Sequence, residues 1–111
     1  MSGFENYQRE AADIERALLI QMTALGIEWT DEAAVAALAR EALGSSPSQV
    51  QALLRDPDRR LRAKGEMFAL SVLMLRLMAE SATVGVHTHG GPAWKAFGSA
   101  LLRAGGGDGA Q

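Results

Sequence analysis

The two histidines of the chain lie two positions apart, in a segment that could offer metal ligands. His87 and His89 are the only histidines among 111 residues, and the chain contains no cysteine. Two imidazoles from one segment can bind a divalent metal ion, but a protein site needs a third or fourth ligand. Glu80 is the one carboxylate within reach in the sequence. We expect no metal site, so His87 and His89 are weak candidates and a polar loop is the simpler interpretation.

Catalytic patterns are missing from the rest of the sequence. The absence of cysteine removes thiolate nucleophiles, and no serine stands in the glycine-flanked turn that exposes a hydrolase nucleophile. Gly90 and Gly91 lead into a predicted helix, but Pro92 removes one amide donor and neither common phosphate-binding glycine pattern is present. We therefore expect neither enzyme activity nor a cofactor.

Residues 35–54 could form a pair of helices joined by a turn. Leu38 and Ala39 precede Gly44, and apolar positions follow at Val50 and Leu53. This segment resembles the helix-turn-helix superfamily of DNA-binding proteins. The resemblance implies a DNA-binding transcriptional regulator that uses a hairpin at residues 35–55, with candidate contacts at Ser48, Gln51, Arg55, Arg59 and Arg60. A plain core hairpin is the alternative that we favour.

Charge is distributed unevenly along the chain. The net charge of −2 combines −5 in residues 1–54 with +3 in residues 55–111. Such asymmetry can steer a charged partner or let two copies pair head to tail, although two solvated faces are the simpler explanation. The acidic first half also disfavours nucleic acid as a partner, because DNA binding needs positive potential around the inserted helix.

The apolar periodicity is helical throughout. We expect an all-α, single-domain bundle of about five helices over residues 1–104, and a disordered glycine-rich tail at 105–111. Gly26 should end the first helix, and Thr30 should cap the second. Ser46, with Pro47 and Gln49 after it, predicts the start of the third helix. The expected helices cover residues 4–25, 31–43, 47–55, 57–82 and 92–102.

The predicted fourth helix should be the hydrophobic centre of the bundle. Residues 67–79 are apolar nearly all the way round, but the run is too short to cross a membrane. Four partner helices would not cover it, so we expect a homodimer or another protein partner on it. The interface residues would be Met67, Leu70, Leu73, Met74, Leu77 and Met78.

These expectations favour a small cytoplasmic protein that acts by protein–protein contact. It would be an adaptor, regulator, chaperone or inhibitor of a second protein, and no secretory signal is evident at its start. Arg76 is the one charge within residues 67–79. An unpaired arginine is costly in an apolar layer, so we expect it to pair with Glu80, Asp13 or Glu15.

Overall fold

The computed structural model describes residues 2–83 and 90–107, and every regular element in these ranges is helical, which confirms the all-α class. Five α-helices form the bundle, and a π-helical turn, η1, follows the last of them. Their bounds are α1 Ser2–Leu25, α2 Glu32–Gly44, α3 Pro47–Leu54, α4 Arg59–Thr83, α5 Pro92–Leu102 and η1 Arg103–Gly107.

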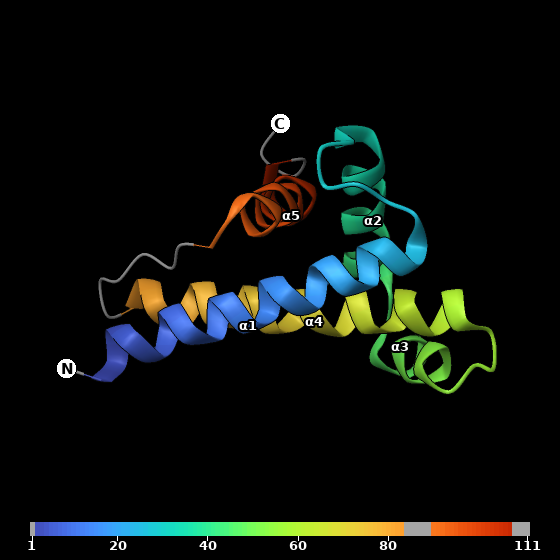
Figure 1. Ribbon diagram of the computed structural model, residues 1–111, viewed down its shortest axis with the longest axis horizontal. Coiled ribbons are helices and arrows are strands. Elements are labelled where there is room, and N and C mark those ends of the chain that lie inside the picture. The colour runs from blue at the N-terminus through green and yellow to red at the C-terminus, as the bar shows by residue number, and fades with distance from the viewer. Residues whose placement is uncertain (1, 84–89, 108–111) are drawn as a thin grey trace.

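Helix α4 lies at the centre of the arrangement, as the sequence predicts. It runs antiparallel to α1 along most of the length of both helices (Figure 1). The short α3 packs on the first half of α4, whereas α2 and α5 pack together on the other side of the α1–α4 pair. Because α4 touches all four other helices, much of its apolar surface is covered from within the chain.

The core forms where α1, α4, α2 and α5 meet. Its largest fully buried side chains are Leu18 and Met22 of α1, Met67 and Met74 of α4, and Phe97 and Leu101 of α5. On α4 the buried positions recur at helical spacing and define one inward face. On the opposite side α3 covers the first half of α4, and Val72, Leu73 and Arg76 beyond it are exposed.

Local signals set the ends of the helices, with corrections at the start of α2 and at the start of α4, which begins at Arg59 and not at residue 57 as expected. Gly26 follows α1 with a φ of 73°, a left-handed conformation that costs glycine little. Helix α2 is capped by Asp31, whose side chain accepts the Ala34 N–H at 3.1 Å, and not by Thr30 as expected. Both residues are good caps, and the helix begins one residue later than predicted.

The third helix begins as the sequence predicts. The Ser46 hydroxyl accepts the Gln49 N–H at 3.2 Å, and Gln49 Oε1 accepts the Ser46 N–H at 2.7 Å, which completes a capping box. Helix α4 begins at Arg59, two residues after Pro57. Asp58 Oδ1 accepts the Arg60 N–H at 2.9 Å beside this start.

The described chain ends in a short helical turn. Residues 103–107 form the π-helical turn η1, which lies against α2 and α5. Residues 108–111 lie outside the described residues. His87 and His89 also lie outside them, so the structure does not bear on the histidine pair.

Candidate interaction surface

The outer side of the α1–α4 pair carries exposed apolar side chains. Val72 and Leu73, at the middle of α4, are 55% and 43% exposed. Ile20 of α1 is 60% exposed and lies two turns after Asp13 on the same side of that helix. We call these three exposed residues, Ile20, Val72 and Leu73, the α1–α4 face; of the three, Leu73 lines the groove between the two helices.

A groove runs beside this face, between α1 and α4. Its volume is about 330 Å³, and its apolar wall consists of Ile14 from α1 and Leu73 and Leu77 from α4. Charged side chains line the rest of the groove, namely Glu10, Asp13, Arg76 and Glu80. An apolar strip between charged edges is the arrangement found where helices of two proteins pack together.

The charges in this groove differ from the sequence-based expectation. Arg76 is exposed, and within the described part of the chain it makes no ion pair or hydrogen bond. Asp13 pairs instead with Arg16 at 3.1 Å, one turn along α1. The predicted pairing of Arg76 with Glu80, Asp13 or Glu15 is therefore wrong. The arginine lies on the solvent side of α4, where water solvates its charge and no ion pair is needed.

Glu15, another predicted partner of Arg76, has a different role. Its carboxylate accepts the backbone N–H groups of Gly91, Ala93 and Trp94 at 2.7, 3.1 and 3.2 Å. Gly91 has no side chain to cap α5, so the Glu15 carboxylate from α1 accepts the hydrogen bonds of the free amides. Its negative charge also interacts favourably with the positive end of the helix dipole. Sequence spacing could not reveal this contact across more than 70 residues.

The expected interface on α4 needs correction at three of its six positions. Met67, Met74 and Leu77 are core side chains, because α1, α2, α3 and α5 cover that side of the helix. Leu70 and Met78 are half-buried against the core, and Leu73 is exposed. Val72 and Ile20, which the sequence analysis did not single out, are the other exposed members of the surface.

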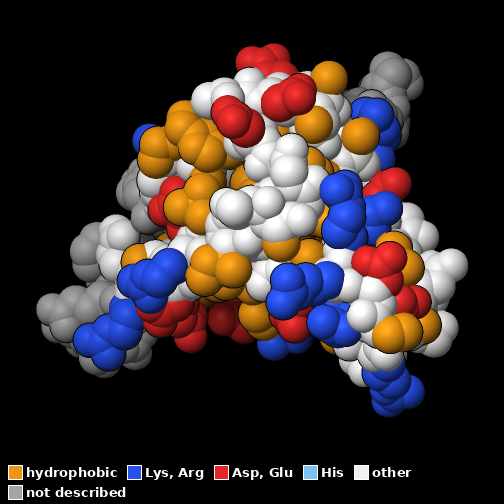
Figure 2. Space-filling model, turned by 45° about the vertical axis from the view of Figure 1, so that its right-hand side comes forward, with side chains coloured by type: hydrophobic (Ala, Val, Ile, Leu, Met, Phe, Trp, Pro, Cys, Tyr) orange, Lys and Arg blue, Asp and Glu red, His pale blue; other side chains and the backbone are white. Residues whose placement is uncertain are grey.

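The candidate DNA contacts include arginines with different surroundings. Arg60 Nη2 donates to the carbonyl of Leu25 at 3.2 Å, at the end of α1. Arg55 and Arg59 are exposed, but Asp56 and Asp58 lie between them in the sequence. The face shown in Figure 2 carries lysine and arginine side chains together with acidic and apolar ones.

The polar residues of α3 give little help to a DNA-binding interpretation. Ser48 shares a hydrogen bond with the Ser46 hydroxyl at 3.2 Å, and Gln51 is exposed. Arg62, which follows the candidate arginines, donates through Nη1 to the carbonyls of Asp56 and Pro57 at 2.9 and 3.0 Å. Arg62 therefore helps to hold the turn between α3 and α4.

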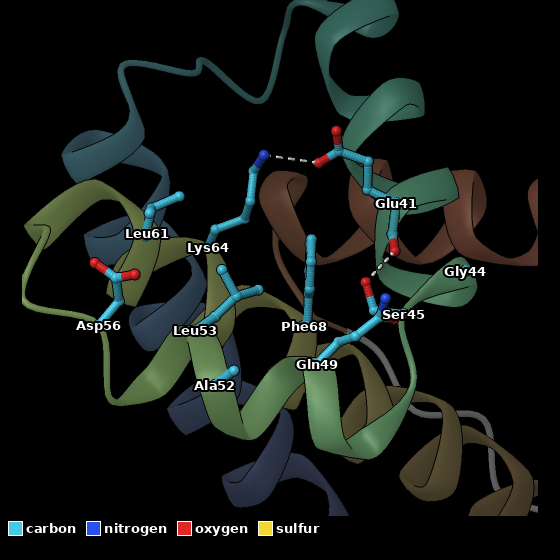
Figure 3. A pocket seen from close by; sticks show the side chains of 10 residues that line it. All are labelled: Glu41, Gly44, Ser45, Gln49, Ala52, Leu53, Asp56, Leu61, Lys64 and Phe68. Carbon is cyan, nitrogen blue, oxygen red and sulfur yellow. Dashed lines mark hydrogen bonds and ion pairs between the residues drawn. The ribbon is translucent and has the colours of Figure 1, made fainter.

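A second cavity, of about 540 Å³, lies between α2, α3 and α4 (Figure 3). Lys64 Nζ and Glu41 Oε1 form an ion pair across it at 3.1 Å, and Leu53, Leu61 and Phe68 supply apolar walls. Because the two charges neutralise each other, the cavity offers mainly apolar contact. Its described lining includes no histidine or cysteine that could begin nucleophilic or metal chemistry.

Residues 2–83 and 90–107 contain no group of three or more side chains placed to hold a metal ion. In the same ranges, no helix combines the length and apolar character needed to cross a membrane. No protein-family model, curated protein or solved structure matches the chain. The function must therefore be argued from the surface itself.

Proposed function

We propose that this protein acts by protein–protein contact, and that its first partner is a second copy of the chain docked on the α1–α4 face. The observation that carries the proposal is the exposure of Leu73 and Val72 at the middle of the central helix. Contact with water is unfavourable for such apolar side chains, so their burial by a partner lowers the free energy. A dimer would present each remaining surface twice, as adaptors and regulators of a second protein do.

The size of the hydrophobic effect supports this surface over isolated apolar residues elsewhere. Full burial of a Leu, Val or Ile side chain contributes about 1.5–3 kcal/mol. Leu73 would be buried once on each chain of a symmetric dimer, which helps offset the entropy lost on association. Leu102 is also exposed, at 58%, but it lies on α5 and outside this face.

DNA binding receives less support from the same structure. A helix-turn-helix needs free cations that share a face with its second helix. Lys64 is instead paired with Glu41, and Arg60 donates to the carbonyl of Leu25 at the end of α1. We therefore place protein contact first.

Substitution of Leu73 tests this proposal. Leu73→Glu would put a charge in the centre of the dimer interface, and we expect sedimentation equilibrium to show a monomer where the wild-type chain is a dimer. Leu102→Glu is the matched control, since it adds the same charge at another exposed leucine, on α5, and should leave the dimer intact. Equal masses for the wild-type chain and Leu73→Glu would refute the proposed surface.

A further inference from the structure

One side of α4 carries a regular row of six residues between α1 and α3. Its members are separated by alternating steps of four and three residues, which keeps them on one side of the helix. Five of the six are exposed and Ala69 is half-buried, so the row faces outward. We call it the α4 stripe: Arg62, Glu66, Ala69, Leu73, Arg76 and Glu80.

Two copies of the α4 stripe that run in opposite directions have complementary charges. Read from either end, the stripe places arginine opposite glutamate and alanine opposite leucine. We infer that two copies pair through antiparallel α4 helices with the dyad at the level of Ser71. Arg62 would then face Glu80 of the partner subunit, and Glu66 would face Arg76 of the partner subunit. The small Ala69 leaves room for the partner's Leu73.

The alternative pairings of the same stripe bring like charges together. Parallel helices in register would place each of the four charged residues against its own copy. An antiparallel pair centred at Leu73 would set Glu66 against the partner's Glu80, and one centred at Ala69 would set Arg62 against the partner's Arg76. Like charges that face each other across a helix interface disfavour the pairing, so only the register centred at Ser71 satisfies all four charges.

The charged members of the stripe are available for such contacts. Glu66, Arg76 and Glu80 make no ion pair or hydrogen bond within the part of the chain that the structure describes. Arg62 uses only Nη1 for the carbonyls of Asp56 and Pro57, so its other guanidinium nitrogens can still donate. As far as residues 2–83 and 90–107 are concerned, these side chains are therefore available to a second copy.

This inference rests on the proposed function and adds orientation and register to it. Exposed ion pairs contribute little affinity, whereas opposed like charges choose between competing arrangements. Leu73 and its apolar neighbours would supply the affinity, and the four charges would select the antiparallel register. The two contributions can be tested separately.

Charge reversal at two positions tests the register. In a homodimer of Arg76→Glu, the new glutamate would face Glu66 of the partner subunit on each side of the dyad. In a homodimer of Glu66→Arg, the new arginine would face Arg76 of the partner subunit. We expect each variant to dimerise at least about tenfold more weakly than the wild-type chain. In an equal mixture of the two variants, the heterodimer places an arginine against a glutamate at both contacts between positions 66 and 76. The heterodimer should therefore regain nearly wild-type affinity. Native mass spectrometry distinguishes it from both homodimers.

Arg40→Glu is the matched control, because Arg40 is exposed on α2 and lies outside the stripe. It should neither weaken the dimer nor select a partner in mixtures. If Arg76→Glu and Glu66→Arg dimerise like the wild-type chain, or if their mixture gives a random distribution, the register is wrong. Loss of the dimer in Leu73→Glu with no effect of the charge reversals would keep the proposed function and overturn only this inference. A monomeric wild-type chain would overturn both.

Cysteine cross-linking provides a second measurement that does not depend on charge. The natural chain has no cysteine, so introduced thiols react only with each other. Mixing Ala69→Cys with Leu73→Cys should give mainly the mixed disulfide, because these positions face each other across the dyad. Mainly unmixed disulfides would contradict the register.

Discussion

The side chain of Glu15 joins two parts of the chain that are distant in the sequence, helix α1 and the start of α5. Its carboxylate accepts three backbone N–H groups at the start of α5, which has no cap of its own. The sequence identified Glu15 as a candidate for pairing with Arg76, because both charges were assumed to face the same apolar layer. The structure puts Arg76 in solvent and gives the carboxylate to backbone amides. The spacing of charges along α1 cannot show that the N-terminus of α5 lies beside Glu15.

Removal of the Glu15 carboxylate should destabilise the fold. Glu15→Ala leaves three amides at the start of α5 without their acceptor, and we expect a loss of about 1–3 kcal/mol in the free energy of unfolding. Urea denaturation followed by circular dichroism measures this loss. Glu28→Ala is the control, since Glu28 is exposed and its side chain makes no hydrogen bond in the described structure. Equal stabilities for the two variants would show that the contact contributes nothing.

Helix α3 approaches α4 most closely at Gly65. A Cβ atom at this position would lie 2.9 Å from the Leu53 Cβ and 3.1 Å from the Leu54 backbone nitrogen. Because backbone atoms of α3 form part of this contact, the short helix would have to shift as a unit. The close approach explains how an eight-residue helix with no fully buried side chain stays packed on α4.

Gly65→Ala should therefore destabilise the protein, although alanine favours helix formation. Overpacking of this kind costs about 1–3 kcal/mol, which outweighs a gain in helix propensity of about 1 kcal/mol. Gly44→Ala is the matched variant, because a Cβ there meets no atom within 4 Å, and it should be neutral or slightly stabilising. Thermal unfolding of the two variants compares them directly. A higher melting temperature for Gly65→Ala would refute the tight packing.

The bounds of the elements were largely predictable because short-range interactions set them. The Ser46 capping box and the left-handed Gly26 act within a few residues, and the sequence located both. Asp31 replaced Thr30 as the cap of α2, since neighbouring residues with the same chemistry compete for one position. The helical turn at residues 103–107 has no such short-range signal in its glycine-rich sequence, and it lies against α2 and α5.

At the scale of the whole molecule, the sequence predicted a central apolar helix but not which of its sides is free. Met67 and Met74 turned out to lie in the core, and Leu73 did not. Composition cannot separate these positions, because the partition depends on where α1, α3 and α5 pack. The exposed remainder, Leu73 within the α4 stripe, carries the proposal of a symmetric antiparallel dimer.

The molar mass of the wild-type chain tests this account most directly. Light scattering coupled to size exclusion, at micromolar concentration, should give twice the 11.8 kDa of one chain, falling toward the monomer mass on dilution. Leu73→Glu should give the monomer mass at the same concentration while keeping its helical circular dichroism spectrum. A wild-type mass of 11.8 kDa at every concentration would contradict the central claim.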